Sequence, residues 1–320
     1  MKILRLDNTA QPPVAVPGRA PIPKPAKGEL LIKVFAAGLT PTELSWYPTS
    51  HTRTGAARTS AVPGHEFSGV VTAVGEDVGS LEIGHDVFGM NDWYSNGAMA
   101  EYCTAPFFAV APKRPSLTHV EAASVPISAL TAWQALFDHA KLQPGERVLI
   151  HGGAGSVGAF AIQFAYLHGA RVTTTVSARD FDFVSGLGAE QVIDYRKSPF
   201  ENRVKGMDIV FDTVGGDTLE RSWRVLQPGG RLVTVVSTAE GSTDPRIQKA
   251  FFIVEPNRKQ LVEVGALLDS GKVQPVVDTV IPLSQAPEAY AGKVPKLGRG
   301  KLVVAVTELD EKDKGNHDKN

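Results

Sequence analysis

Apolar residues occur in short runs over about the first 120 residues, and glycine or proline interrupts them. The runs at 30–37 and 69–75 predict two β-strands, the first after a Lys-Gly turn and the second between glycines. Further turn signals follow at Gly84, Gly89 and Gly97. This spacing is typical of an irregular, mostly β domain.

From about residue 120 the pattern changes. Helical spacing over 120–139 predicts a helix, and strand and helix patterns then alternate. The strand candidates are short and apolar or β-branched: 147–151, 171–176, 192–193, 208–211, 231–236 and 251–254. Because helical or turn-rich pieces separate them, we expect a parallel sheet covered on both faces. Six strands match the six of a doubly wound nucleotide-binding fold.

The last part of the chain predicts a helix, a strand and a tail. An amphipathic pattern over 257–270 ends at Gly271, which is a good helix stop. A β-branched strand pattern covers 301–306. The segment 308–320 is charged, has no apolar residue beyond Leu309, and is expected to be disordered.

Composition narrows the classes of function. A chain of 320 residues suits two domains better than one core, and 42% hydrophobic residues is ordinary for a globular protein. A formal net charge of -1 gives no reason to expect nucleic acid or an anionic membrane as partner. Cys103 is the one cysteine, so neither an intrachain disulfide nor a multi-cysteine metal site can form. With no signal-like or membrane-length apolar run, we expect a cytoplasmic protein.

A glycine-rich turn stands between the strand at 147–151 and an apolar helix pattern at 157–167. From Gly153 it is G-x-G-x-x-G in a strand–turn–helix setting, which favours a dinucleotide site over a turn that serves packing alone. Gly153 would permit the tight turn, Gly155 the approach of a pyrophosphate, and Gly158 close packing of helix on strand. The helix-start amides would receive the negative charge. The predicted contacts are Gly153, Ala154, Gly155, Ser156, Val157 and Gly158.

The end of the second strand of this domain indicates which dinucleotide binds. An NAD enzyme usually has an acidic residue there to hold the ribose 2′-hydroxyl. This chain has Ser177 and Arg179 instead, a hydroxyl donor and a planar cation for a 2′-phosphate. NADPH is therefore the predicted cofactor. The alternative is that Arg179 is a solvated charge at a helix start and that Asp180 or Asp182 allows NADH to bind.

Seven further segments match one family in chain order. They are AAGLTPTE at 36–43, GHEFSGVV at 64–71, GAMAEY at 97–102, ALTAW at 129–133, VIDY at 192–195, DTVGG at 212–216 and GK at 300–301. With the glycine loop, these segments resemble the medium-chain dehydrogenase/reductase superfamily, specifically its quinone oxidoreductase-like branch. The resemblance covers nearly the whole chain.

The resemblance implies an α/β fold made of two domains. A GroES-like, mostly β catalytic domain would cover 1–123, and a doubly wound Rossmann domain with a parallel sheet, which binds NADP, would cover 124–256. The chain would return to the catalytic domain over 257–307, before the tail at 308–320. Similar enzymes are commonly homodimers, although no residue here establishes one.

Zinc members of the superfamily hold catalytic zinc with a Cys at the position of Thr40, the His of the G-H-E motif and a Cys near Ile127. This chain keeps only His65, with Glu66 beside it. Catalytic zinc needs three protein ligands and an open position. The resemblance therefore implies a zinc-independent member with no metal site, in which His65 and Glu66 are structural or line the pocket.

Without a metal, the chemistry depends on placing the nicotinamide hydride against an electrophilic acceptor. By position in the family, Thr40 and Thr131 are the catalytic candidates beside the nicotinamide, and an ordinary helix or turn role is the alternative for each. The further cofactor contacts that the resemblance implies are Tyr195, Thr213, Val214, Phe252, Ile253 and Lys301. The aromatic residues Trp46, Tyr47, Trp93 and Tyr94 form either an apolar slot for a flat substrate or part of the core.

Together these features predict an NADPH-dependent reductase whose small-molecule substrate is a quinone or an α,β-unsaturated carbonyl compound. An enoyl or acyl thioester reductase of the same superfamily is one alternative. An NADPH-binding protein with a non-catalytic role is another. A third is an alcohol dehydrogenase that binds zinc through His65, Glu66 and an unforeseen ligand.

Overall fold

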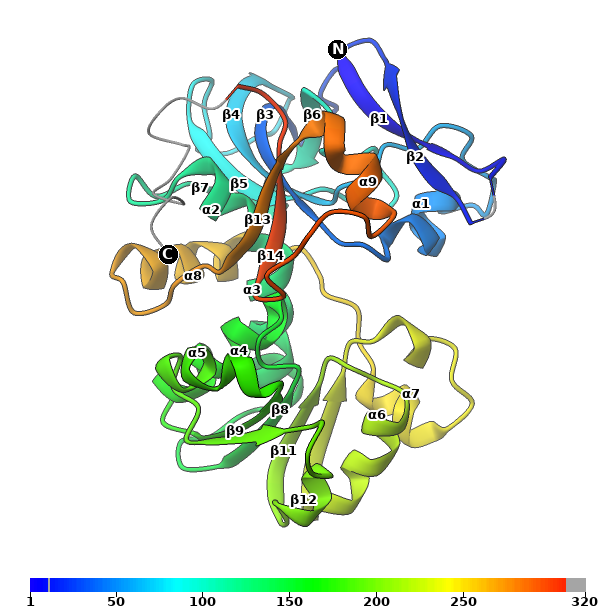
Figure 1. Cartoon of the computed structure of the whole chain (residues 1–320). Helices are drawn as coiled ribbons and strands as arrows, with labels where there is room; N and C mark the ends of the chain where they lie inside the picture. The colour runs from blue at the N-terminus through cyan, green and yellow to red at the C-terminus, as the bar shows by residue number, and fades with distance from the viewer. Residues whose placement is uncertain (11, 309–320) are drawn as a thin grey trace. The chain divides into compact units, whose positions relative to one another are not determined.

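The computed structural model describes residues 1–10 and 12–308 (Figure 1). The chain divides into two compact units. The first contains Met1–Ile127, Pro256–Gly271 and the chain from Pro275, and the second contains Ser128–Glu255 with Lys272–Gln274. The sequence places the corresponding boundaries nearby, at 123/124 and 256/257, but does not predict that Lys272–Gln274 belong to the second unit. Its predicted tail lies, apart from Glu308, outside the described residues.

The first unit is built on a seven-stranded sheet. Its strand order is β13-β14-β3-β4-β5-β7, with β6 paired to β3. The strands are β3 (Glu29–Leu39), β4 (Glu66–Val74), β5 (Asp86–Met90), β6 (Tyr102–Pro106), β7 (Val110–Pro112), β13 (Val277–Pro282) and β14 (Lys301–Ala305). All pairs are antiparallel except β13 with β14. The mostly β first domain is thus confirmed.

Smaller elements complete this unit. They are the ribbon of β1 (Lys2–Asp7) and β2 (Val14–Arg19) and the helices α1 (Tyr47–Ser50), α2 (His119–Ala123), α8 (Arg258–Asp269) and α9 (Ala286–Tyr290). Thr118 and Glu121 form a capping box that begins α2. Asn257 caps α8 by accepting from the amide of Gln260 at 3.1 Å. The sheet's core includes Leu30, Phe67 and Phe88, all fully buried.

The second unit is a parallel sheet in the order β10-β9-β8-β11-β12. Its strands are β8 (Arg147–His151), β9 (Arg171–Val176), β10 (Gln191–Asp194), β11 (Met207–Asp212) and β12 (Leu226–Thr234). Figure 1 shows α4 (Ser156–Leu167) and α5 (Phe181–Gly186) on one side of this sheet, with α6 (Asp217–Ser222) and α7 (Pro245–Ala250) on the other. The consecutive residues Val148, Leu149 and Ile150 are all fully buried, as two covered faces require.

The prediction of a sixth strand over 251–254 is wrong. Phe251 makes only an isolated parallel bridge to Thr234. Its amide donates to Ile247 and ends α7, and the amide of Glu255 donates to the side chain of Gln134 at 3.0 Å. The Phe252 amide donates to the carbonyl oxygen of Thr234 in β12 at 3.3 Å, so the segment meets the sheet at one bridge and does not form a strand.

The helical pattern expected over 120–139 is confirmed, although it forms more than one element. The segment contains α2, α3 (Pro126–Trp133) and a π-helical turn over Gln134–His139. Pro126 has no amide hydrogen, so it begins a helix more readily than it continues one. The boundary between the two units falls inside α3, after Ile127.

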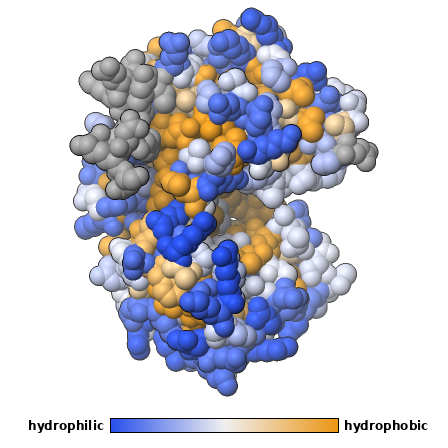
Figure 2. Space-filling model, in the orientation of Figure 1, coloured by the Kyte–Doolittle hydropathy of each residue, from blue (hydrophilic) through white to orange (hydrophobic). Residues whose placement is uncertain are grey.

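Hydrophilic residues are spread over the visible face, with apolar patches between them (Figure 2). None of the helices within the described ranges is both long and apolar enough to span a bilayer.

Candidate functional site

The glycine loop follows β8 and leads into α4. The turn itself is made by Gly152, whose φ of +76° is in the left-handed region, and not by Gly153 as the sequence suggests. A β-carbon on Gly153 would lie 2.1 Å from Oγ1 of Thr174 in β9, so this glycine makes room for the neighbouring strand. Gly158 fits its expected role, since a β-carbon there would lie 2.2 Å from the carbonyl oxygen of Gly152. Gly155 caps α4 without a side chain, so the helix-start amides face no capping group of their own.

Two alanine substitutions separate packing from cofactor binding in this loop. Gly158→Ala is expected to destabilise the protein by about 1–3 kcal/mol, because the added carbon collides with backbone. Gly155→Ala meets only the Gly152 oxygen, at 3.3 Å, and is expected to leave the urea midpoint nearly unchanged. It should weaken NADPH and NADH alike, because its β-carbon enters the pyrophosphate position. Loss of stability in Gly155→Ala, or unchanged cofactor affinity, would contradict this division.

The loop lies where the strand order reverses. From β8 the chain runs outward to β9 and β10, and then returns to β11 and β12 on the other side. In such sheets the ligand binds beyond the carboxyl ends of the strands at this switch point. Thr213 follows β11 and donates its hydroxyl to the carbonyl oxygen of His151, the last residue of β8, at 2.7 Å. This hydrogen bond joins the loop after β11 to the end of β8, where the glycine loop begins, at the switch point.

Asp212 holds the second of these loops. It is fully buried and accepts from the amides of Val214 and Gly215 at 3.1 Å and from the Thr234 hydroxyl at 2.9 Å. Burial raises its pKa, and these hydrogen bonds oppose that shift. Sequence reasoning marked the D-T-V-G-G segment but gave Asp212 no role.

The predicted 2′-phosphate residues lie together beyond β9 and β10. Ser177 donates to Asp180 at 2.6 Å, and Arg179 contacts the same carboxylate oxygen at 3.5 Å. The Asp180 side chain is only 4% exposed, whereas that of Arg179 is 63% exposed. The Tyr195 amide donates to the carbonyl oxygen of Val176 at 3.3 Å, which brings Tyr195 beside the end of β9.

Sequence reasoning missed a second cation in this place. The Arg196 guanidinium lies 5.6 Å from the centre of the Tyr195 ring. A hydrogen bond with the Tyr195 phenol is the largest cause that raises the pKa of Arg196, and Asp180 contributes. The only signal in the sequence is that a cation directly follows the V-I-D-Y match.

Three predicted cofactor residues expose apolar surface. Tyr195 is 57%, Val214 54% and Ile253 52% exposed, all unusually open for large apolar side chains. Each follows a strand, or the bridge to β12, at the carboxyl edge of the sheet. Phe252, by contrast, is buried and stacks on His139 with ring centres 4.1 Å apart. This edge offers both apolar and cationic surface to a dinucleotide.

The two catalytic candidates belong to different units. Thr131 lies in α3, in the second unit, with 4% of its surface exposed. Thr40 lies in the first unit, directly after β3. The catalytic roles of Thr40 and Thr131 remain predictions. The contacts of Thr40, described next, say more about the chemistry of the site than those of Thr131.

Thr40, itself half-buried, is part of a polar cluster where β3 ends and its neighbours β4 and β14 begin. Lys301 Nζ donates to Thr40 Oγ1 at 2.9 Å and forms an ion pair with Oε1 of Glu66. The other carboxylate oxygen of Glu66 accepts from the Ile127 amide at 2.9 Å. Glu66 is fully buried and Lys301 is 5% exposed. Lys301, predicted as a cofactor contact, thus has its ammonium group bonded within the protein.

Glu43 adds a second buried carboxyl beside Thr40. It accepts from the Tyr290 phenol, from the Gly64 amide at 3.0 Å and from the Thr40 amide at 3.4 Å. Burial raises the pKa of Glu43 to about 7, although these hydrogen bonds and the charge of Lys301 oppose the shift. The sequence analysis gave no role to Glu43, which ends the 36–43 match, and did not mark Tyr290.

This raised pKa predicts a pH dependence of stability. The folded protein binds the Glu43 proton up to about pH 7, whereas an unfolded glutamate, with its ordinary pKa of 4.5, releases it at lower pH. The Glu43 contribution to stability is therefore present below about pH 4.5 and is lost as the pH rises toward 7. Urea unfolding at pH 5 and pH 8 should show a larger loss in the unsubstituted protein than in Glu43→Gln. Equal losses would contradict the assignment.

His65 is buried between two indole rings. It is 1% exposed, and its ring lies 6.4 Å from that of Trp46 and 5.1 Å from that of Trp93. Neither ring nitrogen has a hydrogen-bond partner within the described chain. Burial, and then the charge of Arg58, lowers the pKa of His65 to about 3, so the imidazole is neutral.

The four aromatic residues of the expected slot do not form one group. Trp46 and Trp93 pack edge-on at 5.5 Å around His65. Tyr47 is 52% exposed and stacks on His51, and Tyr94 packs under Arg53. Only the two tryptophans therefore remain candidates for an apolar slot.

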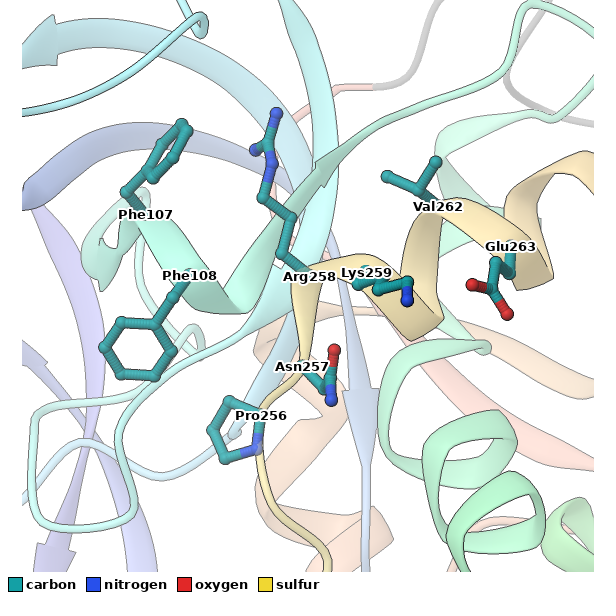
Figure 3. A pocket seen from close by; sticks show the side chains of 8 residues that line it. All are labelled: Phe107, Phe108, Pro256, Asn257, Arg258, Lys259, Val262 and Glu263. Carbon is teal, nitrogen blue, oxygen red and sulfur yellow. The ribbon is translucent and has the colours of Figure 1, made fainter. Parts of the chain in front are cut away.

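A pocket of about 650 Å³ lies elsewhere in the first unit (Figure 3). Phe107 and Phe108 form one wall, and the start of α8 forms the other. Arg258 lies over the Phe107 ring at 4.3 Å. None of the predicted site residues lines this pocket, so it is not the candidate site.

Comparisons with known proteins agree with this geometry. Residues 26–115 match the alcohol dehydrogenase GroES-like domain, and 187–304 match the family described as zinc-binding dehydrogenase. The chain is 32% identical to NAD(P)H oxidoreductase RTN4IP1, mitochondrial, of Danio rerio, over 89% of this chain and 85% of that protein. It is also 32% identical to 2-methylene-furan-3-one reductase of Solanum lycopersicum, over 88% and 73%. The solved structure of the quinone oxidoreductase from Coxiella burnetii is 33% identical to this chain. It aligns with a TM-score of 0.84 over 96% of this chain and 99% of that one.

The chain belongs to the medium-chain dehydrogenase/reductase superfamily, in its quinone oxidoreductase-like branch. It is an NAD(P)H oxidoreductase of that superfamily. The expected α/β fold of a GroES-like domain and a Rossmann domain is confirmed.

The zinc in the name of one matching family does not fit the residues of this chain. Thr40 offers a neutral hydroxyl, and the Glu66 carboxylate is bonded to Lys301 and to the Ile127 amide. Cys103 is a buried thiol whose pKa burial raises to about 12. No three His, Cys, Asp or Glu side chains within residues 1–10 and 12–308 are grouped to hold a metal ion. Of the expected ligands, His65 alone is present.

Proposed function

We propose that this member of the superfamily is a zinc-independent, NADPH-dependent reductase of quinones and α,β-unsaturated carbonyl compounds. The observation that carries the proposal is the cluster at Thr40, where the Lys301 ammonium group supplies positive charge without a metal. The chain also has a complete dinucleotide loop and two cations beyond β9 and β10. These cations support NADPH over NADH.

In the proposed reaction an enone receives hydride from bound NADPH at its β-carbon, the C=C electron pair moves to the carbonyl oxygen, and water supplies the α-proton. A hydrogen-bond donor placed at that oxygen stabilises the developing charge. Thr40 is the proposed donor, and Trp46 and Trp93 of the same unit are the proposed source of flat apolar surface for the acceptor. The 2-methylene-furan-3-one named for the tomato relative has a C=C bond conjugated with a carbonyl, which supports this substrate class.

Steady-state assays test the proposal. NADPH and NADH oxidation would be followed with 1,4-benzoquinone, 9,10-phenanthrenequinone, a simple enone and an enoyl thioester, with and without chelator. NADPH-dependent turnover of a quinone or the enone that survives chelation is the expected result. Turnover of the thioester alone would favour the thioester reductase, and tight NADPH binding without turnover would favour a non-catalytic role. Activity lost with chelator would favour a zinc enzyme.

A further inference from the structure

We propose that Lys301 is a positioning residue that directs the Thr40 hydroxyl proton toward the acceptor. This inference rests on the proposed function and adds to it a role for a residue that touches neither substrate nor reacting atoms. A lysine ammonium group has three donors and no acceptor. In its 2.9 Å hydrogen bond, Thr40 Oγ1 must therefore accept, and its own O–H must point to another partner.

The register of three strands fixes this contact. Leu302 of β14 pairs with Leu39 of β3, so Lys301 comes opposite Thr40 at the next position. Gly300 precedes it with a φ of +72°, and a β-carbon there would lie 2.1 Å from the Val276 carbonyl oxygen. The Lys301 amide donates to that same oxygen at 2.9 Å. Lys301 thus begins β14 at a place that the backbone determines.

A carboxylate from the third strand holds the ammonium group. Glu66 lies in β4, on the far side of β3 from β14, and pairs there with Gly38. A β-carbon on Gly38 would lie 2.4 Å from Oε1 of Glu66, so the glycine lets the carboxylate cross β3 to reach Lys301. The Ile127 amide fixes its second oxygen. With carboxylate on one side and hydroxyl on the other, the buried cation has little freedom.

The contact also makes Thr40 a better donor. Hydrogen bonds in a chain polarise one another, and a bond from a cation strengthens the donor that follows it. An acceptor oxygen that gains negative charge after hydride transfer would then meet an O–H group oriented before it binds. In zinc members a Cys at this position binds the metal ion, whereas here the positive charge comes from the Lys301 ammonium group.

A double-mutant cycle in the Glu66→Gln background tests this role, because the glutamine keeps an oxygen that accepts from Lys301, and Lys301→Met then leaves no buried unpaired carboxylate. Lys301→Met is expected to lower kcat for the enone about ten-fold, while the KM of the enone and the Kd of NADPH change less than about two-fold. Thr40→Val should itself lower kcat about 100-fold. When Thr40→Val is present, Lys301→Met should lower kcat less than about two-fold further. Thr40→Ser, which keeps the hydroxyl, should have nearly the kcat of the threonine enzyme and should again lose about ten-fold on Lys301→Met. Lys296→Met, at an exposed lysine of the same unit, is the matched control.

If Lys301→Met lowered kcat by the same factor with threonine and with valine at position 40, the inference would be overturned. A loss that appears as weaker NADPH binding, measured by cofactor fluorescence, would also overturn it and make Lys301 a cofactor ligand. Turnover by the unsubstituted enzyme would in both cases leave the proposed function standing. No turnover of any acceptor by the unsubstituted enzyme would overturn the proposed function and the inference together.

Discussion

Lys301→Met is expected to lower the free energy of unfolding by about 3–5 kcal/mol, because it leaves the fully buried Glu66 carboxylate without its cation. Urea unfolding measures the loss, and an unchanged m-value would place it in the folded state. The double variant Glu66→Gln/Lys301→Met removes both charges and should regain most of the stability. A double variant as unstable as the single one would mean that packing of the lysine chain, and not the ion pair, stabilises this edge of the sheet.

Arg179→Ala is expected to weaken NADPH binding by about 1.5–3 kcal/mol, a ten- to hundred-fold rise in Kd, because it removes a charge-assisted bond to the 2′-phosphate. NADH lacks that phosphate, so its Kd should change less than about two-fold. Fluorescence titration of both cofactors gives the comparison. Arg171→Ala is the matched control, because Arg171 is an exposed arginine that begins β9, whereas Arg179 follows its end. Equal losses for NADPH and NADH in Arg179→Ala would refute the assignment.

Local patterns predicted the parallel sheet and the position of the dinucleotide loop. Buried strands such as β8 are continuous apolar runs, and a glycine-rich turn between a strand and a helix is typical of this fold. Which glycine makes the turn could not be predicted in the same way. The need for glycine at 153 comes from Thr174 in the next strand, and such contacts leave no mark near the glycine itself.

The polar cluster at Thr40 shows the limit of motif reasoning. Thr40 and Lys301 are 261 positions apart, and Glu43 and Tyr290 are 247 apart, so only the folded sheet joins them. Thr40, Glu43 and Lys301 belong to family matches and Tyr290 does not, but no spacing in the sequence indicates that a lysine and not a cofactor meets the Thr40 hydroxyl. The strand expected over 251–254 failed for a related reason, because its apolar pattern does not show that the Phe251 amide ends α7 and that the segment meets β12 at an isolated bridge.

Transfer of a labelled hydride tests the central claim most directly. Chelator-treated protein would be given a simple enone with NADPH deuterated on one face of C4 or, in a separate reaction, on the other, and the products would be analysed by mass spectrometry and NMR. The proposed zinc-independent reductase should place one deuterium on the β-carbon of a saturated ketone with one of the two labelled cofactors and none with the other. An allylic alcohol, a product without deuterium from both labelled cofactors, or transfer that returns only when zinc is added would contradict the account.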